Sequence, residues 1–149
     1  MASRIAEAFA KAAREERPAF VAYVVAGYPS VDEAVDILLE LEKGGVDAIE
    51  LGIPFTDPLA DGPTIQAAHL VSLANGVDID LALQLVAEAR ARGLQIPVLF
   101  MGYYNPIMQY GEKQVVDRCA EAGIDGYIVV DLPPEEAVSF RGLCAAAGL

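Results

Sequence analysis

A carboxylate interrupts an apolar run at Glu50, and its setting suggests chemistry. Residues 48–53 read Ala-Ile-Glu-Leu-Gly-Ile, a composition typical of a buried strand. Alternation places Glu50 on one face with the small residues Ala48 and Gly52, and the aliphatic residues on the other. If the aliphatic face packs against helices, Glu50 points away from them, beside space for a ligand, where an isolated carboxylate is costly unless paired or protonated and is kept mainly for chemistry. The alternatives are a solvated strand end or a carboxylate paired with a basic group.

The loop after this strand is the second feature that could do chemistry. Residues 54–63 contain three prolines, two aspartates and one glycine, so the backbone is restricted and Asp57 and Asp61 have defined directions. Ligands of parallel α/β folds bind outside the carboxyl ends of the strands, which is where this loop begins. Asp61 also precedes Gly-Pro at an expected helix start, so it could instead be a helix cap. Local sequence leaves both interpretations open.

Further polar residues follow the later strands. Asp131 comes directly after the fourth apolar run, where either site chemistry or turn formation would suit an aspartate. Tyr103, Tyr104 and Asn105 follow the third run and could line an aromatic pocket or pack the loop. His69, the only histidine, falls within an expected helix, and we interpret it as an ordinary helix position.

The elements that must position these residues alternate along the chain. Continuous apolar strands separated by helices favour a parallel sheet covered on both faces. Periodicity does not decide between a doubly wound sheet and a barrel, and neither GxGxxG nor GxxxxGK[ST] occurs at a position that would favour nucleotide binding. Strands are expected at residues 20–26, 48–53, 97–101 and 126–130, and helices at about residues 3–17, 30–44, 63–75, 80–92 and 112–122 and from residue 135.

Composition predicts one globular domain over residues 1–149. Hydrophobic residues make up 54% of the chain and charged residues 21%. The net charge of −12 argues against nucleic acids and anionic membranes as partners, but a phosphorylated substrate is possible because backbone N–H groups at helix N-termini bind phosphate. Neither a secretory signal nor a membrane span is apparent, so we expect a cytoplasmic protein.

The two cysteines offer no metal site. Cys119 and Cys144 lie in helical patterns, without CxxC spacing or a nearby histidine. We expect both to be reduced thiols in or near the core, and no metal to be bound.

Residues 50–66, Glu-Leu-Gly-Ile-Pro-Phe-Thr-Asp-Pro-Leu-Ala-Asp-Gly-Pro-Thr-Ile-Gln, resemble the signature segment of the tryptophan synthase alpha subunit family. Similar matches occur at residues 20–28, after the third strand and at residues 126–136. The resemblance implies a (β/α)₈ TIM barrel, of which this chain supplies an N-terminal helix and about the first four β/α units. It also implies retro-aldol cleavage of indole-3-glycerol phosphate to indole and glyceraldehyde 3-phosphate. Glu50 would be the catalytic acid/base at indole C3, and Asp61 would bind the indole N–H and stabilise positive charge on the ring.

The same resemblance implies a substrate pocket and a partner surface. Tyr23 stands where the family is expected to have phenylalanine, and its hydroxyl needs a partner if buried. Pyridoxal phosphate would belong to the beta subunit of an α₂β₂ tetramer, and this chain would hold no cofactor. The indole pocket would comprise Tyr23, Met101, Tyr103, Ile128 and Val130, and the surface facing the beta subunit Asp57, Pro58, Tyr104, Asn105, Pro106 and Met108.

The length of 149 residues is short of the roughly 250 of a complete barrel. Phosphate-binding loops and a lid are expected beyond the fourth unit, so we expect these residues alone to be inactive. The alternatives are another phosphate-handling barrel lyase or isomerase, against which the Pro-Phe-Thr-Asp-Pro loop argues, and a non-catalytic fragment that retains only beta-subunit docking.

Overall fold

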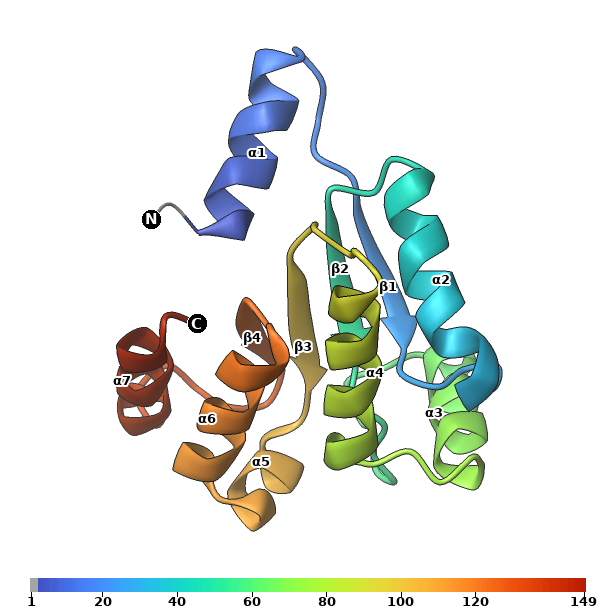
Figure 1. Cartoon of the computed structure of the whole chain (residues 1–149). Helices are drawn as coiled ribbons and strands as arrows, with labels where there is room; N and C mark the ends of the chain where they lie inside the picture. The colour runs from blue at the N-terminus through green and yellow to red at the C-terminus, as the bar shows by residue number, and fades with distance from the viewer. Residues whose placement is uncertain (1–2) are drawn as a thin grey trace.

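The computed structural model describes residues 3–149 and contains a parallel sheet with the strand order β1-β2-β3-β4 (Figure 1). A doubly wound sheet reverses its strand order at a switch point, whereas a barrel adds each strand beside the previous one. The sequential order therefore decides the question that periodicity left open, and the prediction of the first half of a TIM barrel is confirmed. The strands are β1 (Val21–Val25), β2 (Ala48–Gly52), β3 (Val98–Gly102) and β4 (Gly126–Val129).

The helices begin largely where the capping residues predict. Ser3 accepts a hydrogen bond from the Ala6 amide, and Asp78 accepts one from the Leu81 amide. Ser30 precedes its helix as expected, but its hydroxyl donates to the Glu33 carboxylate instead of capping the backbone. The helices are α1 (Arg4–Arg14), α2 (Val31–Lys43), α3 (Pro63–Ala74), α4 (Ile79–Ala91), α5 (Tyr104–Tyr110), α6 (Glu112–Ala122) and α7 (Val138–Ala147).

The structure differs from the sequence prediction in one additional helix and in the start of the last helix. The seven-residue α5 was not expected, because it is too short to display periodicity and contains Pro106. Proline is tolerated in a first turn, where its missing N–H has no helical partner. Asp131 accepts a hydrogen bond from the Tyr104 amide at 2.8 Å, so this aspartate caps α5. The last helix begins at Val138, not near residue 135, because the Pro133 carbonyl first closes a turn with the amides of residues 136 and 137.

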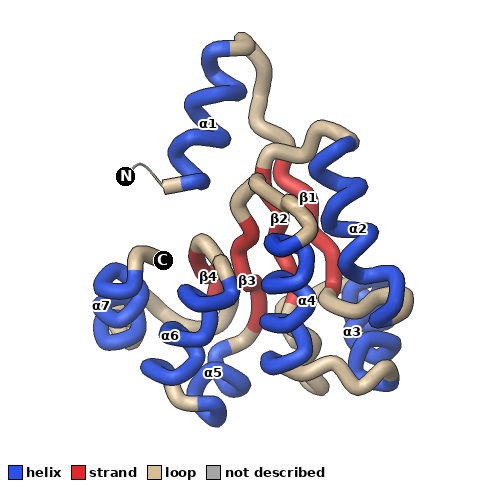
Figure 2. The backbone as a smooth tube through the Cα atoms, in the orientation of Figure 1, coloured by secondary structure: helices blue, strands red, loops and turns tan. Residues whose placement is uncertain are grey.

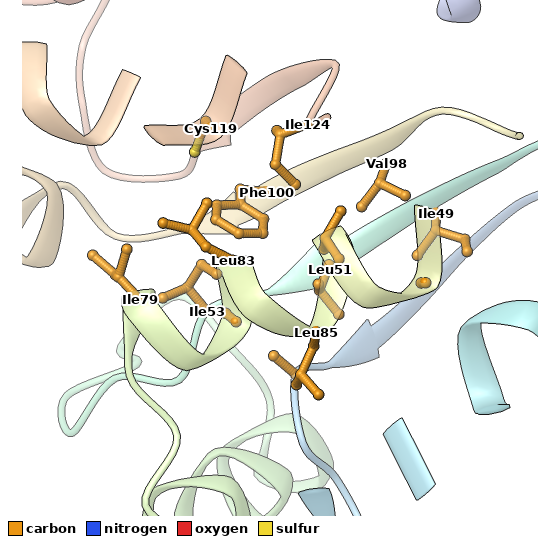
Figure 3. Packing of buried hydrophobic residues seen from close by; sticks show 14 of the residues in the cluster. Ile49, Leu51, Ile53, Ile79, Leu83, Leu85, Val98, Phe100, Cys119 and Ile124 are labelled. Atoms are coloured by element: carbon orange, nitrogen blue, oxygen red, sulfur yellow. The ribbon is translucent and has the colours of Figure 1, made fainter. Parts of the chain in front are cut away.

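The hydrophobic core lies between the sheet and helices α2, α4 and α6, which lie side by side along one face (Figure 2). Ile49, Leu51, Val98 and Phe100 point into this layer and are at most 2% exposed (Figure 3). Fully burying an aliphatic or aromatic side chain of this size contributes about 1.5–3 kcal/mol. Since strand residues alternate, Glu50 must lie on the opposite face, as predicted.

Ion pairs gather at the end of the sheet where the strands begin. Arg4 of α1 contacts Asp125 at 2.9 Å, and Arg90 of α4 contacts the same carboxylate at 2.8 Å. Arg17 binds Asp47, whose carboxylate also accepts from the Phe20 amide. Figure 1 shows α1 at this end and α5 at the opposite end, where the strand arrows point. Barrel folds use the first end for stability and the second for chemistry.

Within residues 3–149, every individual helix is too short or too polar to cross a bilayer, and only the bent pair α3 and α4 meets the length and composition requirement jointly, at 92° to each other.

Candidate active site

Glu50 and Tyr23 are register neighbours on the face of the sheet that points away from the helices. Glu50 is half-buried, and in the described chain its carboxylate makes no ion pair or hydrogen bond. The ring of Tyr23 lies over Gly52, where a Cβ atom would overlap the Tyr23 hydroxyl. The space expected over Gly52 is thus filled by the tyrosine, a correction to the prediction that it is left for a ligand. The absence of a side chain at residue 52 leaves the room that the Tyr23 ring occupies.

Asp61 is held by Tyr103, the residue that directly follows β3, and it does not cap α3. The Tyr103 hydroxyl donates to Asp61 Oδ2 at 2.8 Å, while the Ala60 amide donates to the Tyr103 oxygen at 2.9 Å. The N-cap of α3 is Gly62, without a side-chain cap, so the capping alternative is wrong. Of the hydrogen bonds between residues 3 and 149, none reaches Asp61 Oδ1. This oxygen can therefore accept a hydrogen bond from a ligand.

His69 lies in the middle of these groups, although the sequence suggested an ordinary helix position. Its Nδ1 accepts from the Phe55 amide at 3.0 Å, and its Nε2 lies 3.4 Å from the Tyr23 oxygen and 3.7 Å from Asp61 Oδ2. The ring is 2% exposed, and burial lowers the pKa of His69 although the negative Asp61 opposes this shift. The sequence signal was a polar pair, His69 and Ser72, on one face of α3.

The Tyr23 hydroxyl lies in the electrostatic field of both carboxylates. Burial raises the pKa of Tyr23, and the negative charges of Asp61 and Glu50 raise it further. Tyr23 is therefore a neutral hydroxyl at physiological pH, and Asp61 and Glu50 both lie within electrostatic reach of it. The prediction that its hydroxyl requires a partner is confirmed by the contact with His69.

Apolar residues continue this surface across the sheet. Met101 and Ile128 are register neighbours in line with Gly52, one pair of residues further along the strands than Glu50. Tyr103 is buried and packs on Phe55, with ring centroids 5.3 Å apart. Val130 follows β4 and is 37% exposed. The expected indole pocket residues therefore share one face or its rim, beside two carboxylates that differ in their hydrogen bonding.

Comparison with known proteins identifies the family, since residues 9–149 match the family model described as the tryptophan synthase alpha chain. The chain belongs to this family.

Two curated proteins and one solved structure are similar to this chain over nearly its whole length. A tryptophan synthase alpha chain of Roseiflexus sp. (strain RS-1) is 48% identical over 147 residues, covering 99% of this chain and 56% of that protein. A tryptophan synthase of Saccharomyces cerevisiae is 48% identical over 149 residues, covering 100% of this chain and 21% of that protein. The crystal structure of tryptophan synthase subunit alpha from Legionella pneumophila str. Paris has a TM-score of 0.96 and 40% identity, covering 100% of this chain and 57% of that one. The chain spans about half the length of the alpha chains it matches.

The residues that the alpha chain family was expected to use for partner contact lie on the same rim. Asp57, Asn105 and Met108 are exposed, and Pro58 and Pro106 are half-buried. The ring of Tyr104 is turned inward, because its hydroxyl donates to Glu112 at 2.8 Å and its ring packs edge-on against Phe140. Leu59, which sequence reasoning did not single out, is 89% exposed.

The two cysteines lie in helices, Cys119 in α6 and Cys144 in α7. Both cysteines are free thiols, and burial raises the pKa of Cys119 to about 12, so it is not a thiolate at neutral pH. Over residues 3–149, no group of three His, Cys, Asp or Glu side chains is arranged to hold a metal ion.

Proposed function

We propose that these residues form the catalytic half of a tryptophan synthase alpha subunit, a lyase that cleaves indole-3-glycerol phosphate to indole and glyceraldehyde 3-phosphate. The observation that carries the proposal is the pair of carboxylates beside Tyr23. Asp61 is held on one oxygen by Tyr103, and Glu50 has no protein partner in the described chain. Because the chain spans about half the length of its alpha chain relatives, the reaction is proposed for a complete barrel containing these residues.

The two carboxylates are suited to different roles. Asp61 Oδ1 accepts the indole N–H, and its negative charge stabilises the positive charge that develops on the ring. Glu50 delivers a proton to indole C3. The Glu50 carboxylate, having given up its proton to C3, then takes the proton of the hydroxyl on the attached side-chain carbon as the bond from C3 to that carbon breaks. The bonding electrons return to the ring, and the carbon becomes the aldehyde of glyceraldehyde 3-phosphate.

The neighbouring side chains support binding of an aromatic ring. Met101, Ile128 and Val130 supply apolar surface, and the rings of Tyr23 and Tyr103 supply flat contacts. No described residue is assigned to the phosphate, whose loops are expected after later strands of the barrel. The ring-binding and proton-transfer parts of the site are thus the parts that this chain would contribute.

The partner proposed for the rim is a tryptophan synthase beta subunit, in a cytoplasmic α₂β₂ tetramer in which the pyridoxal phosphate belongs to the partner. Support comes from apolar side chains exposed on two rim segments, with Leu59 89% and Met108 50% exposed. Exposed apolar residues surrounded by polar ones mark interaction surfaces. Asp57 and Asn105 would provide the polar contacts at the edge.

Indole release tests the activity, and indole binding tests the site in the chain itself. We expect a complete alpha subunit carrying these residues to release indole from indole-3-glycerol phosphate, and Glu50→Gln to abolish release with little loss of substrate binding. Because this chain contains no tryptophan, indole fluorescence reports the ligand alone. Asp61→Asn should weaken indole binding to the chain by about tenfold, the value of one hydrogen bond to a charged group. An active Gln variant would refute the role of Glu50.

Docking without catalysis is the second candidate function, favoured by the exposure of Leu59 and Met108. Binding to a beta subunit with no indole release from any complete subunit that carries these residues would support docking and refute the lyase.

A further inference from the structure

We propose that His69 is a positioning residue, a neutral Nε2–H donor that orients Asp61 and Tyr23 toward an aromatic N–H ligand. The inference rests on the proposed function, because it concerns the same site. It goes beyond that function by giving a role to the only histidine in the chain. His69 lies on α3, which contacts β1, so a helix residue reaches a side chain of the sheet.

A backbone amide decides which nitrogen of the His69 ring carries the hydrogen. A neutral imidazole has one nitrogen that donates and one that accepts, and the hydrogen bond made by one nitrogen decides the role of the other. Nδ1 of His69 faces the Phe55 amide at 3.0 Å and must therefore accept. The ring hydrogen is then on Nε2, which points toward the Tyr23 oxygen and Asp61 Oδ2.

The position of this hydrogen has a consequence for Asp61. Oδ2 accepts a hydrogen bond from the Tyr103 hydroxyl at 2.8 Å, and of the two carboxylate oxygens it is also the one that His69 Nε2 approaches, at 3.7 Å. Oδ1 remains free for the ligand within the described chain. At 3.4 Å from the Tyr23 oxygen, Nε2 makes a long hydrogen bond, whereas Asp61 Oδ2 at 3.7 Å lies just beyond hydrogen-bonding distance, so a small movement on ligand binding would bring it within reach.

The neutrality of His69 also matters. A charged imidazolium would pair with Asp61 and cancel the negative charge that stabilises positive charge developing on the indole ring. Burial disfavours the charged ring, and the groups facing it are Asp61 on the loop after β2 and Tyr23 on β1, with the Phe55 amide at the other ring nitrogen. The ring therefore donates without neutralising the carboxylate.

The first test needs no ligand and no catalysis. With a single histidine, a nitrogen-15 spectrum of the chain contains one imidazole, whose two nitrogens report the tautomer. We expect the Nε2–H form at neutral pH, and protonation only below the ordinary value of about 6.5. Asp61→Asn should shift protonation to still lower pH, because it removes the negative charge that favours the imidazolium. An Nδ1–H ring, or titration at the ordinary value in both proteins, would overturn the proposal.

The second test distinguishes the role of Nδ1, which accepts from the Phe55 amide, from the role of Nε2, which faces Tyr23 and Asp61. His69→Asn can keep an acceptor for the Phe55 amide but cannot reach Asp61, whereas His69→Gln can place a donor near the Nε2 position. We expect the Asn variant to bind indole about tenfold more weakly and the Gln variant to recover most of this loss. Ser72→Ala is the control, since Ser72 is also buried on α3 but bonds the Ala26 carbonyl, and it should bind indole as the wild type does.

The outcomes distinguish this inference from the proposed function. If the wild-type chain does not bind indole, the ligand proposal fails, while the imidazole spectrum still decides the tautomer and its coupling to Asp61. If indole binds equally well to the wild type and the Asn variant, the proposed function stands and the positioning role is wrong. If Ser72→Ala weakens binding as much as His69→Asn, the effect is one of helix stability, and the positioning role is again wrong.

Discussion

The Tyr103 hydroxyl donates to Asp61 Oδ2 at 2.8 Å, although the two residues are 42 positions apart in the sequence. The same hydroxyl accepts a hydrogen bond from the Ala60 amide at 2.9 Å. One side chain from the end of β3 thereby shapes both the backbone and the carboxylate of the loop after β2. The direction of Asp61 is decided by a neighbouring strand and not by the loop alone.

Tyr103→Phe should loosen the loop and weaken ligand binding. The variant removes the donor to Asp61 and leaves the Ala60 amide without its acceptor, which costs about 1–3 kcal/mol of the free energy of unfolding. Urea denaturation measures this cost, and an indole titration should show weaker binding. Tyr110→Phe is a matched control, because that hydroxyl also donates to a carboxylate, that of Asp80 at 2.7 Å, away from Asp61. Equal loss of indole binding in both variants would contradict the assignment.

Gly52→Ala should displace the ring of Tyr23. The added Cβ would overlap the tyrosine hydroxyl, and overpacking of this kind costs about 1–3 kcal/mol of the free energy of unfolding. In a double-mutant cycle with Tyr23→Ala, the cost of the added methyl group should largely disappear, since its partner is gone. If the losses of unfolding free energy, measured by urea denaturation, in the two single variants add up in the double variant, the methyl group at residue 52 does not clash with Tyr23.

Acid should destabilise the chain through Asp47. Hydrogen bonds from Arg17 hold the pKa of this carboxylate well below its usual 3.8, helped by the Phe20 amide. The stabilisation is therefore present above pH 3.8 and is lost as the pH falls below it toward the lower folded pKa. Asp47→Asn should unfold more easily at neutral pH, with a smaller further loss below pH 4 than the wild type. Parallel urea curves for both proteins across this range would contradict the ion pair.

The two thiols should differ in reactivity. Cys119 is fully buried beside the Tyr127 hydroxyl, and burial raises its pKa to about 12, whereas Cys144 is half-buried. Alkylation at pH 8 followed by mass spectrometry should label Cys144 first and Cys119 only after unfolding, because the thiolate is the reactive form. Labelling of Cys119 in the folded protein at the rate of Cys144 would show that this part of the core opens.

Much of the fold could be predicted from local signals. The four strands, and the helices that begin after Ser3, Ser30 and Gly62, follow from apolar runs, capping residues and Pro63 at a first helical turn. The short helix α5 could not be predicted in this way, because its first amide is satisfied by Asp131 from beyond the next strand.

The sequence by itself determined that Glu50 lies on the strand face opposite Ile49 and Leu51, since side chains alternate along a strand, and the structure buries that aliphatic face against the helices. Residues 50–66 also determined the family, because the segment is contiguous and needs no folding to be compared.

Only the tertiary structure decided the strand order, the role of Asp61 and the contacts of His69. Each of these depends on groups far apart in the chain, such as Tyr103 with Asp61 or Tyr23 with His69, which parallel strands and a packed helix bring within hydrogen-bonding reach. Local patterns record which face a residue takes, whereas the partner it meets there depends on how the strands and helices pack together.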